Sequence, residues 1–99
     1  MTEETRNRTI LSIMKIIDLK DINRKETHIY YRRVFFGIAI IDLLHNPVEK
    51  RIEFTIETTP LGKKEISVSL LDHIEYPLIP LLQGLRHKIA ELDSQGVLP

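Results

Sequence analysis

The sequence has no cysteine, and its 99 residues include only four glycines. Without cysteine the protein has no disulfide, no thiolate metal site and no cysteine nucleophile, so any metal must be bound by histidine and carboxylate side chains. The four glycines are isolated and form none of the glycine-rich motifs that bind phosphate. The domain must therefore be held together by packing alone.

The sequence also lacks a net charge and a long apolar run. Fourteen basic residues balance fourteen acidic ones, so no long-range field attracts phosphates, and nucleic acid is disfavoured as a partner. The longest apolar stretch, residues 34–41, is far shorter than the roughly 20 residues of a membrane-spanning helix. The first nine residues lack the apolar core of a secretory signal. We therefore expect a cytoplasmic protein that does not enter a membrane.

What the sequence does contain is the composition of a folded domain. Hydrophobic residues make up 42% of the chain and charged residues 28%, which excludes a disordered tail. No internal repeat, low-complexity tract or linker divides it. We therefore predict a single α+β domain over residues 1–99.

The clearest predicted element is an amphipathic helix over residues 78–95. Its apolar residues recur at spacings of three and four, as one buried face of a helix requires. Pro77 and Pro80 lie at its start, where a missing N–H does little harm, and Gly96 is placed to end it. The apolar face consists of Leu78, Leu81, Leu82, Leu85, Ile89 and Leu92.

Two strands with one apolar face each precede this helix. Apolar and polar residues alternate over residues 51–57 and again over residues 65–70, which is the pattern of a half-buried strand. Pro60 and Gly62 between them suit a turn. The two segments predict a hairpin whose apolar side the helix covers.

The stretch from Thr27 to Asp42 is predicted as a strand that is apolar on both faces from Val34 onward. Its density of isoleucine, valine, tyrosine and phenylalanine favours a strand, and we expect a turn at Asn46 and Pro47 to follow it. One face of this strand lacks a partner within the chain. A second subunit or the N-terminal segment folded back must cover it, and we predict a homodimer. The predicted interface residues are Val34, Phe35, Phe36, Ile38 and Ile40.

The segment from Thr9 to Ile22 fits two structures. Its isoleucines favour a strand, joined to the next strand by a polar connection over residues 20–27. Its spacing also suits a helix that would begin near Thr2. We predict an antiparallel four-stranded β-meander packed on one face by the C-terminal helix. The alternative order is α-β-β-β-α.

Histidines and carboxylates follow two strands of this meander. The second and fourth strands run in the same direction, so their ends share one edge of the sheet, about 9.6 Å apart at two strand spacings. A cluster there could bind a divalent metal such as zinc or act in acid–base hydrolysis, although no dedicated metal spacing is present. The residues of this candidate site are Asp42, His45, Asp72, His73 and Glu75.

The sequence YYRRVFF offers a third candidate site. Aromatic residues beside arginines resemble the stacking surfaces that bind single-stranded nucleic acid, and the candidate residues are Tyr30, Tyr31, Arg32 and Arg33. The competing interpretation is that the aromatics pack and the arginines pair with Glu53 or Glu57 of the next strand.

The function predicted from these features is a small, non-enzymatic binding or adaptor module that acts as a homodimer and needs no cofactor. The alternatives are a metal-binding or hydrolytic site at the strand ends, a nucleic-acid surface, and a pocket for a hydrophobic small molecule between sheet and helix.

Overall fold

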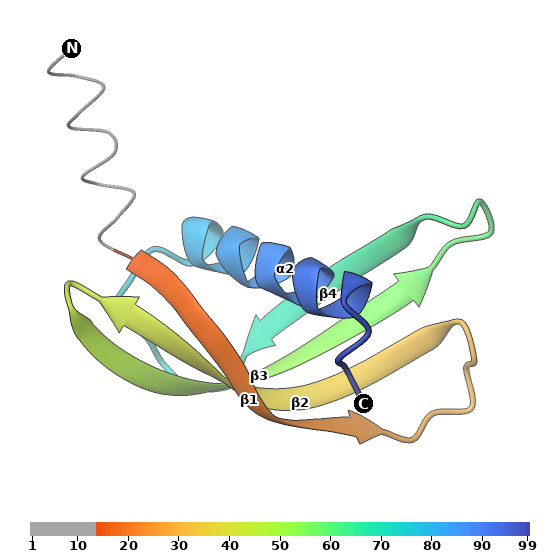
Figure 1. Ribbon diagram of the computed structural model, residues 1–99, viewed down its shortest axis with the longest axis horizontal. Coiled ribbons are helices and arrows are strands. Elements are labelled where there is room, and N and C mark those ends of the chain that lie inside the picture. Colours follow the sequence, from red (N-terminus) through yellow and green to blue (C-terminus); the bar gives the residue numbers. More distant parts are fainter. Residues whose placement is uncertain (1–13) are drawn as a thin grey trace, which may run out of the picture.

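The computed structural model describes residues 14–99, which form one antiparallel sheet and one helix (Figure 1). The elements are β1 (Met14–Lys25), β2 (Arg32–Leu43), β3 (Asn46–Thr58), β4 (Lys64–Leu70) and α2 (Leu78–Ser94). The strands lie in the sheet in their order along the chain, so the predicted meander is confirmed. Within this described part, no helix has the length and apolar character needed to cross a bilayer.

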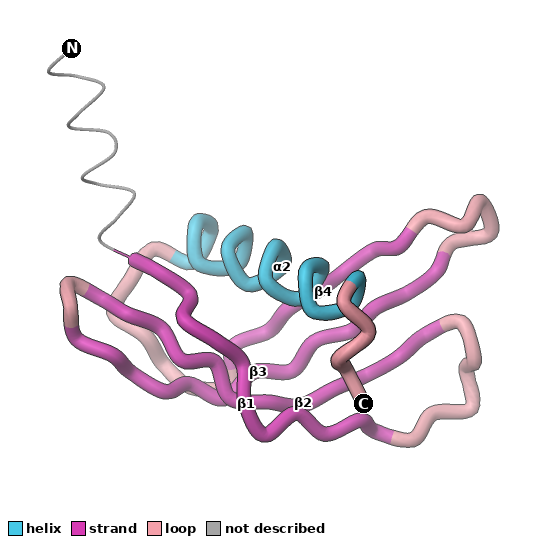
Figure 2. Tube along the Cα trace, viewed as in Figure 1, coloured by secondary structure: helices cyan, strands magenta, loops and turns pink. Residues whose placement is uncertain are grey.

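The helix α2 lies across one face of the sheet, and this inner face carries the core (Figure 2). Its fully buried residues Leu81, Leu85 and Ile89 form one stripe along the helix. Beneath it, the rings of Phe35 and Phe54 stack with their centroids 4.8 Å apart. Both edge strands, β1 and β4, lie against the helix. Large side chains therefore fill the space between sheet and helix.

The first strand, β1, is confirmed from Met14 onward, but it differs from the prediction in two respects. Its register against β2 shifts between Ile16 and Asp18 and again between Lys20 and Asn23. Each shift marks an extra residue that changes which side chains face inward. The strand also continues to Lys25, so the polar connection predicted over residues 20–27 was wrong.

These two irregularities explain why the segment suited both a helix and a strand. The inward apolar side chains of β1 are separated by two, three and three residues. This spacing lies between the period of two of a strand and the period of about 3.6 of a helix. They are Met14, Ile16, Leu19 and Ile22. The α-β-β-β-α alternative is excluded because the described part of this segment is a strand. Residues 2–13, where that helix would begin, lie outside the described residues.

The turn between β2 and β3 lies two residues earlier than predicted. Leu44 and His45 form it, with φ angles of 50° and 63°. Two residues with positive φ give the hairpin turn whose twist matches that of the flanking strands. Pro47 is not in the turn but within β3, where it pairs with Asp42 of β2.

The nitrogen of Pro47 faces away from β2, toward an edge without a neighbouring strand. The backbone groups of Arg51 point to the β4 side. The carbonyl oxygen of Arg51 accepts a hydrogen bond from the N–H of Leu71, and the N–H of Arg51 donates one to the carboxylate of Asp72. Backbone direction alternates along a strand, so Pro47 turns its nitrogen to the same side. β4 has already ended at this level, because its last residue, Leu70, pairs with Ile52. Proline is therefore tolerated here.

Candidate functional site

The outer face of the sheet, turned away from α2, carries a row of apolar side chains on β2. Phe35, Ala39 and Ile41 are fully buried on the inner face, so the residues that alternate with them point outward. Phe36 is 37% exposed, and the other members of the row are half-buried. This outer row consists of Val34, Phe36, Ile38 and Ile40. The prediction that β2 is apolar on both faces is therefore confirmed.

One predicted interface residue does not belong to this surface. Phe35 has 0% of its surface exposed and stacks on Phe54 in the core. Side chains alternate between the two faces of a strand, so Phe35 cannot share a surface with Phe36. Its assignment to the dimer interface was wrong.

Charged and polar residues flank the outer row on both sides. The residues that the strand pairing places opposite the row lie on the same face of the sheet. On β1, opposite Val34, Phe36, Ile38 and Ile40 in turn, these are Lys25, Asn23, Lys20 and Asp18. On β3, in the same order, they are Thr55, Glu53, Arg51 and Glu49.

One ion pair crosses the outer row. The Nζ atom of Lys20 on β1 lies 2.9 Å from Oε2 of Glu49 on β3, and β2 lies between these two strands. The hydrogen bond to Glu49 raises the pKa of Lys20 above its ordinary value of 10.5. The pair is exposed to solvent and stabilises the fold little. Its position over β2 shields only one part of the apolar row.

The tyrosines of the nucleic-acid candidate lie at one end of the molecule, beside the β3–β4 hairpin. Tyr30 is 94% exposed, and its ring meets that of Tyr31 edge to face at 5.9 Å. The carbonyl oxygen of Tyr31 accepts a hydrogen bond from the N–H of Thr58. An open hollow of about 740 Å³ lies here, lined by Tyr30, Tyr31, Glu57, Thr58, Thr59 and Pro60.

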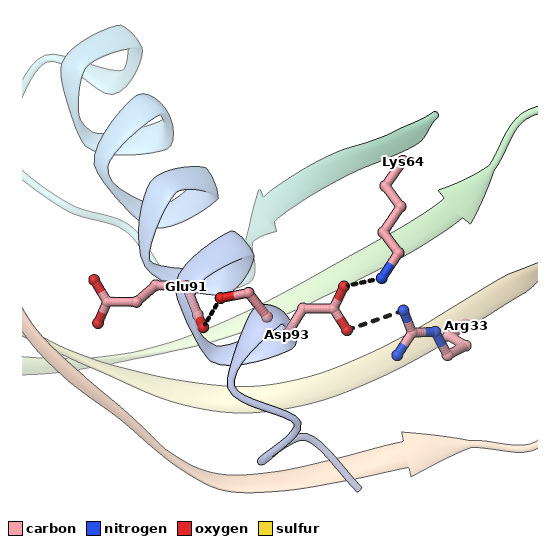
Figure 3. Close-up of polar contacts among 5 residues, drawn as sticks. Arg33, Lys64, Glu91 and Asp93 are labelled. Carbon is pink, nitrogen blue, oxygen red and sulfur yellow. Dashed lines mark hydrogen bonds and ion pairs between the residues drawn. The ribbon is translucent and has the colours of Figure 1, made fainter. Parts of the chain in front are cut away.

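The two arginines of that candidate have partners within the chain. Arg32 lies 3.7 Å from Glu57 of β3, as the competing interpretation predicted. Arg33 instead points toward the helix, where its Nη2 atom donates to Oδ1 of Asp93 at 3.0 Å (Figure 3). The guanidinium of Arg33 also lies over the ring of Phe35, at 5.9 Å from its centroid. Arg33 is therefore held toward the helix and away from the tyrosines, whereas Arg32 makes only a long, exposed contact with Glu57.

Asp93 joins the end of α2 to two strands. Its second oxygen accepts a hydrogen bond of 2.7 Å from Nζ of Lys64 at the start of β4 (Figure 3). The side chain of Asp93 is only 10% exposed, which strengthens both interactions. The hydrogen bond from Lys64, and then that from Arg33, holds the pKa of Asp93 below its ordinary value of 3.8.

The predicted histidine and carboxylate cluster does not assemble. Asp72 accepts hydrogen bonds from the side chain and the backbone of Arg51, which lower its pKa to about 2. Among the described residues, the one side-chain polar contact of His73 is with its neighbour Glu75, at 3.0 Å on the exposed surface. Asp42 has one buried oxygen, Oδ1, without a hydrogen-bond partner among residues 14–99. Nor do those residues contain any group of three or more histidine or carboxylate side chains placed to hold a metal.

The cluster fails because the strands end at different levels. Leu70 at the end of β4 pairs with Ile52, which pairs with Gly37 of β2. β2 continues from Gly37 to Leu43, about 20 Å further along the sheet. The shared edge that the meander topology predicted therefore does not exist.

Sequence reasoning missed Asp93 and the pair of Arg51 with Asp72. Asp93 stands among charged residues near the end of a helix, where a solvated side chain is the default expectation. Its one signal was its position directly after the apolar Leu92. Asp72 directly follows a strand, and Asp at that position commonly bonds the backbone, which was a usable signal.

Comparisons with known proteins place the chain in a family. A search among curated proteins gives no match, and a search among solved structures gives none either. The model of the BB-0187 family matches residues 11–94. This match covers all four strands and the whole of α2. The chain therefore belongs to the BB-0187 family.

Proposed function

We propose that the protein is a non-catalytic binding module that works as a homodimer assembled through the outer face of its sheet. The observation that carries this proposal is the outer row on β2. No described element covers this row, since α2 packs on the opposite face. An apolar surface flanked by charged residues is the usual composition of a protein interface.

The other candidate sites support a function less well. The histidines and carboxylates lie apart within residues 14–99, and both arginines beside the tyrosines are engaged within the chain. The core side chains Phe35, Phe54 and Leu81 are fully buried between sheet and helix, and the hollow between β1 and α2 is open to solvent. To bind a second copy over its full length, the outer row needs only the exposed side chains of Lys20 and Glu49, whose ion pair crosses it, to move aside.

The expected dimer is weak, because the surface is small. Three strands at the usual spacing span about 14 Å, and the row of β2 is about 20 Å long. An interface of this size falls below the ~1,200 Å² of total buried area at which stable complexes begin. We therefore expect the dimer to dissociate on dilution.

The proposal is tested by measuring the solution mass by light scattering over a tenfold range of concentration, with and without zinc. We expect the mass to rise toward that of two chains as concentration increases, with no effect of zinc. The variant Phe36→Glu places a charge in the centre of the outer row and should stay at the mass of one chain.

The matched control is Ile79→Glu, which introduces the same charge at a 72% exposed apolar residue of α2. This variant should associate as the unaltered protein does, and circular dichroism should show that both variants are folded. A single-chain mass for the unaltered protein at every concentration would contradict the proposal. Association that appears only with zinc would favour the histidines instead.

A further inference from the structure

We infer that the two subunits pair with their β2 strands antiparallel, about a two-fold axis that lies between the facing sheets and crosses β2 at right angles at the level of Gly37. This inference rests on the proposed homodimer, and it names the arrangement of the second copy. The charges that flank the outer row favour this arrangement.

Such an axis fixes which residues meet. Positions equally far from Gly37 on its two sides lie opposite each other across the interface. Val34 then faces the partner's Ile40, and Phe36 faces the partner's Ile38. The apolar row is thus matched against itself over its full length.

The charged residues of the flanking strands are matched as well. Asp18 is level with Ile40 and Lys25 is level with Val34, so Asp18 faces the partner's Lys25. On β3, Arg51 is level with Ile38 and Glu53 with Phe36, so Arg51 faces the partner's Glu53. Each contact occurs twice by symmetry, and each joins opposite charges.

Opposite charges also meet at the two ends of the β2 row. Arg32 and Asp42 are equally far from Gly37 and lie on the outer face with the row. In the antiparallel arrangement, Arg32 faces the partner's Asp42. Facing sheets pack about 10 Å apart, a gap that long charged side chains can bridge.

The parallel arrangement brings like charges together. A two-fold axis that runs along β2 keeps every residue at its own level and places β1 over the partner's β3. Asp18 would then face the partner's Glu49, and Lys20 would face the partner's Arg51. Like charges in direct opposition are unfavourable, so the charge pattern selects the antiparallel arrangement.

Three of the charges that this pairing uses form no ion pair within the described chain. Among residues 14–99, Asp18, Lys25 and Glu53 take part in no ion pair. Arg51 binds Asp72 with its side chain 66% exposed, so it can approach Glu53 of the partner subunit without leaving Asp72. The pairs of Asp18 with Lys25 and of Arg51 with Glu53 therefore form without breaking an existing ion pair of these four residues.

The inference is tested by exchanging the charges of one pair. Asp18→Lys alone and Lys25→Asp alone each create two like-charge contacts per dimer, and each should weaken association by about tenfold. The double variant restores both contacts with the charges exchanged, and its dissociation constant should return to that of the unaltered protein. Analytical ultracentrifugation at low salt measures all four proteins.

The results of these measurements distinguish a failure of the antiparallel arrangement from a failure of the homodimer itself. If Asp18→Lys tightens association, or if the double variant stays as weak as the single ones, the antiparallel arrangement is overturned while the homodimer stands. If the unaltered protein never associates, both proposals fail.

Cross-linking gives a second test that does not depend on the charged variants being folded. The natural chain has no cysteine, so an introduced one is unique. A mixture of Val34→Cys and Ile40→Cys chains should be joined by a short bismaleimide, whereas Val34→Cys alone should not. Efficient cross-linking of Val34→Cys alone would indicate the parallel arrangement and overturn the inference.

Discussion

At the scale of single residues, Asp93 connects the elements that are most distant along the chain. Its carboxylate receives Arg33 from β2 and Lys64 from β4, and it lies in the last turn of α2. The carboxylate is largely shielded from water, and so is much of Arg33. Removing one partner of a shielded ion pair leaves the other without compensation, which is more harmful than the loss of an exposed pair.

We expect Asp93→Asn to lower the free energy of unfolding by about 1–2 kcal/mol at neutral pH. The replacement keeps the shape of the side chain but removes the charge that both cations contact. Urea unfolding followed by circular dichroism measures this change. The control is Glu91→Gln, which removes an exposed charge from the same helix and should change the unfolding free energy by less than about 0.5 kcal/mol.

The same carboxylate predicts a dependence on pH. The pKa of Asp93 is lower in the folded than in the unfolded protein, so its contribution is fully present above the ordinary value of 3.8. This contribution is lost as the pH falls through the lowered pKa. The difference in stability between the natural protein and Asp93→Asn should therefore shrink below about pH 4. A difference that stays constant from pH 7 to pH 3 would contradict this assignment.

At the scale of elements, the sequence predicted those that follow one period throughout. β3, β4 and α2 keep a spacing of two or of three to four. The bounds of β4 and α2 were predicted within one residue, whereas β3, predicted over residues 51–57, begins five residues earlier, at Asn46. β1 was ambiguous because its two irregularities break the period of two. The turn was misplaced because leucine and histidine are uncommon at positive φ, whereas Asn46 and Pro47 are typical turn residues.

The candidate sites likewise divide into those that a local pattern determines and those that depend on how distant segments are placed. The outer row was predictable because alternation along one strand determines it. The relative levels at which two strands end depend on register, which the sequence alone did not provide, and so the histidine cluster was expected where none forms among residues 14–99. The partners of Arg33 and Arg51 also lie far away along the chain, on segments whose placement requires the folded structure.

The contact between α2 and β1 depends on a glycine. A Cβ atom added at Gly84 would lie 3.2 Å from Cγ1 of Ile16, which is closer than most side chains tolerate. We expect Gly84→Val to lower the free energy of unfolding by about 1–3 kcal/mol, because it forces the helix away from β1. Gln83→Val places the same side chain at an exposed neighbour and serves as the control. Equal unfolding midpoints for the two variants would show that the close approach is unimportant.

At the scale of the whole molecule, the proposed association and the folding equilibrium are linked. A partner that binds only the folded chain stabilises it by mass action. The sheet has a single helix on one face, so the second copy contributes a layer that the described part of the 99-residue chain does not supply by itself.

The melting temperature of the unaltered protein should therefore rise with concentration, by about 3 °C for each tenfold increase above the dissociation constant. Phe36→Glu should melt at one temperature regardless of concentration, because its outer row no longer binds. Differential scanning calorimetry at several concentrations provides the measurement. A melting temperature of the unaltered protein that does not change with concentration would contradict this linkage.

The position of Pro47 has a consequence for how far association can proceed. At the uncovered end of β3, Pro47 offers no N–H to an incoming strand, and Asp72 already occupies the N–H of Arg51. An open strand edge that lacks such protection recruits further chains one after another, which is the route to amyloid fibrils. Pairing through the outer face closes after two copies, whereas growth along an edge has no natural end. The proline and the aspartate thus protect this edge against unlimited polymerisation.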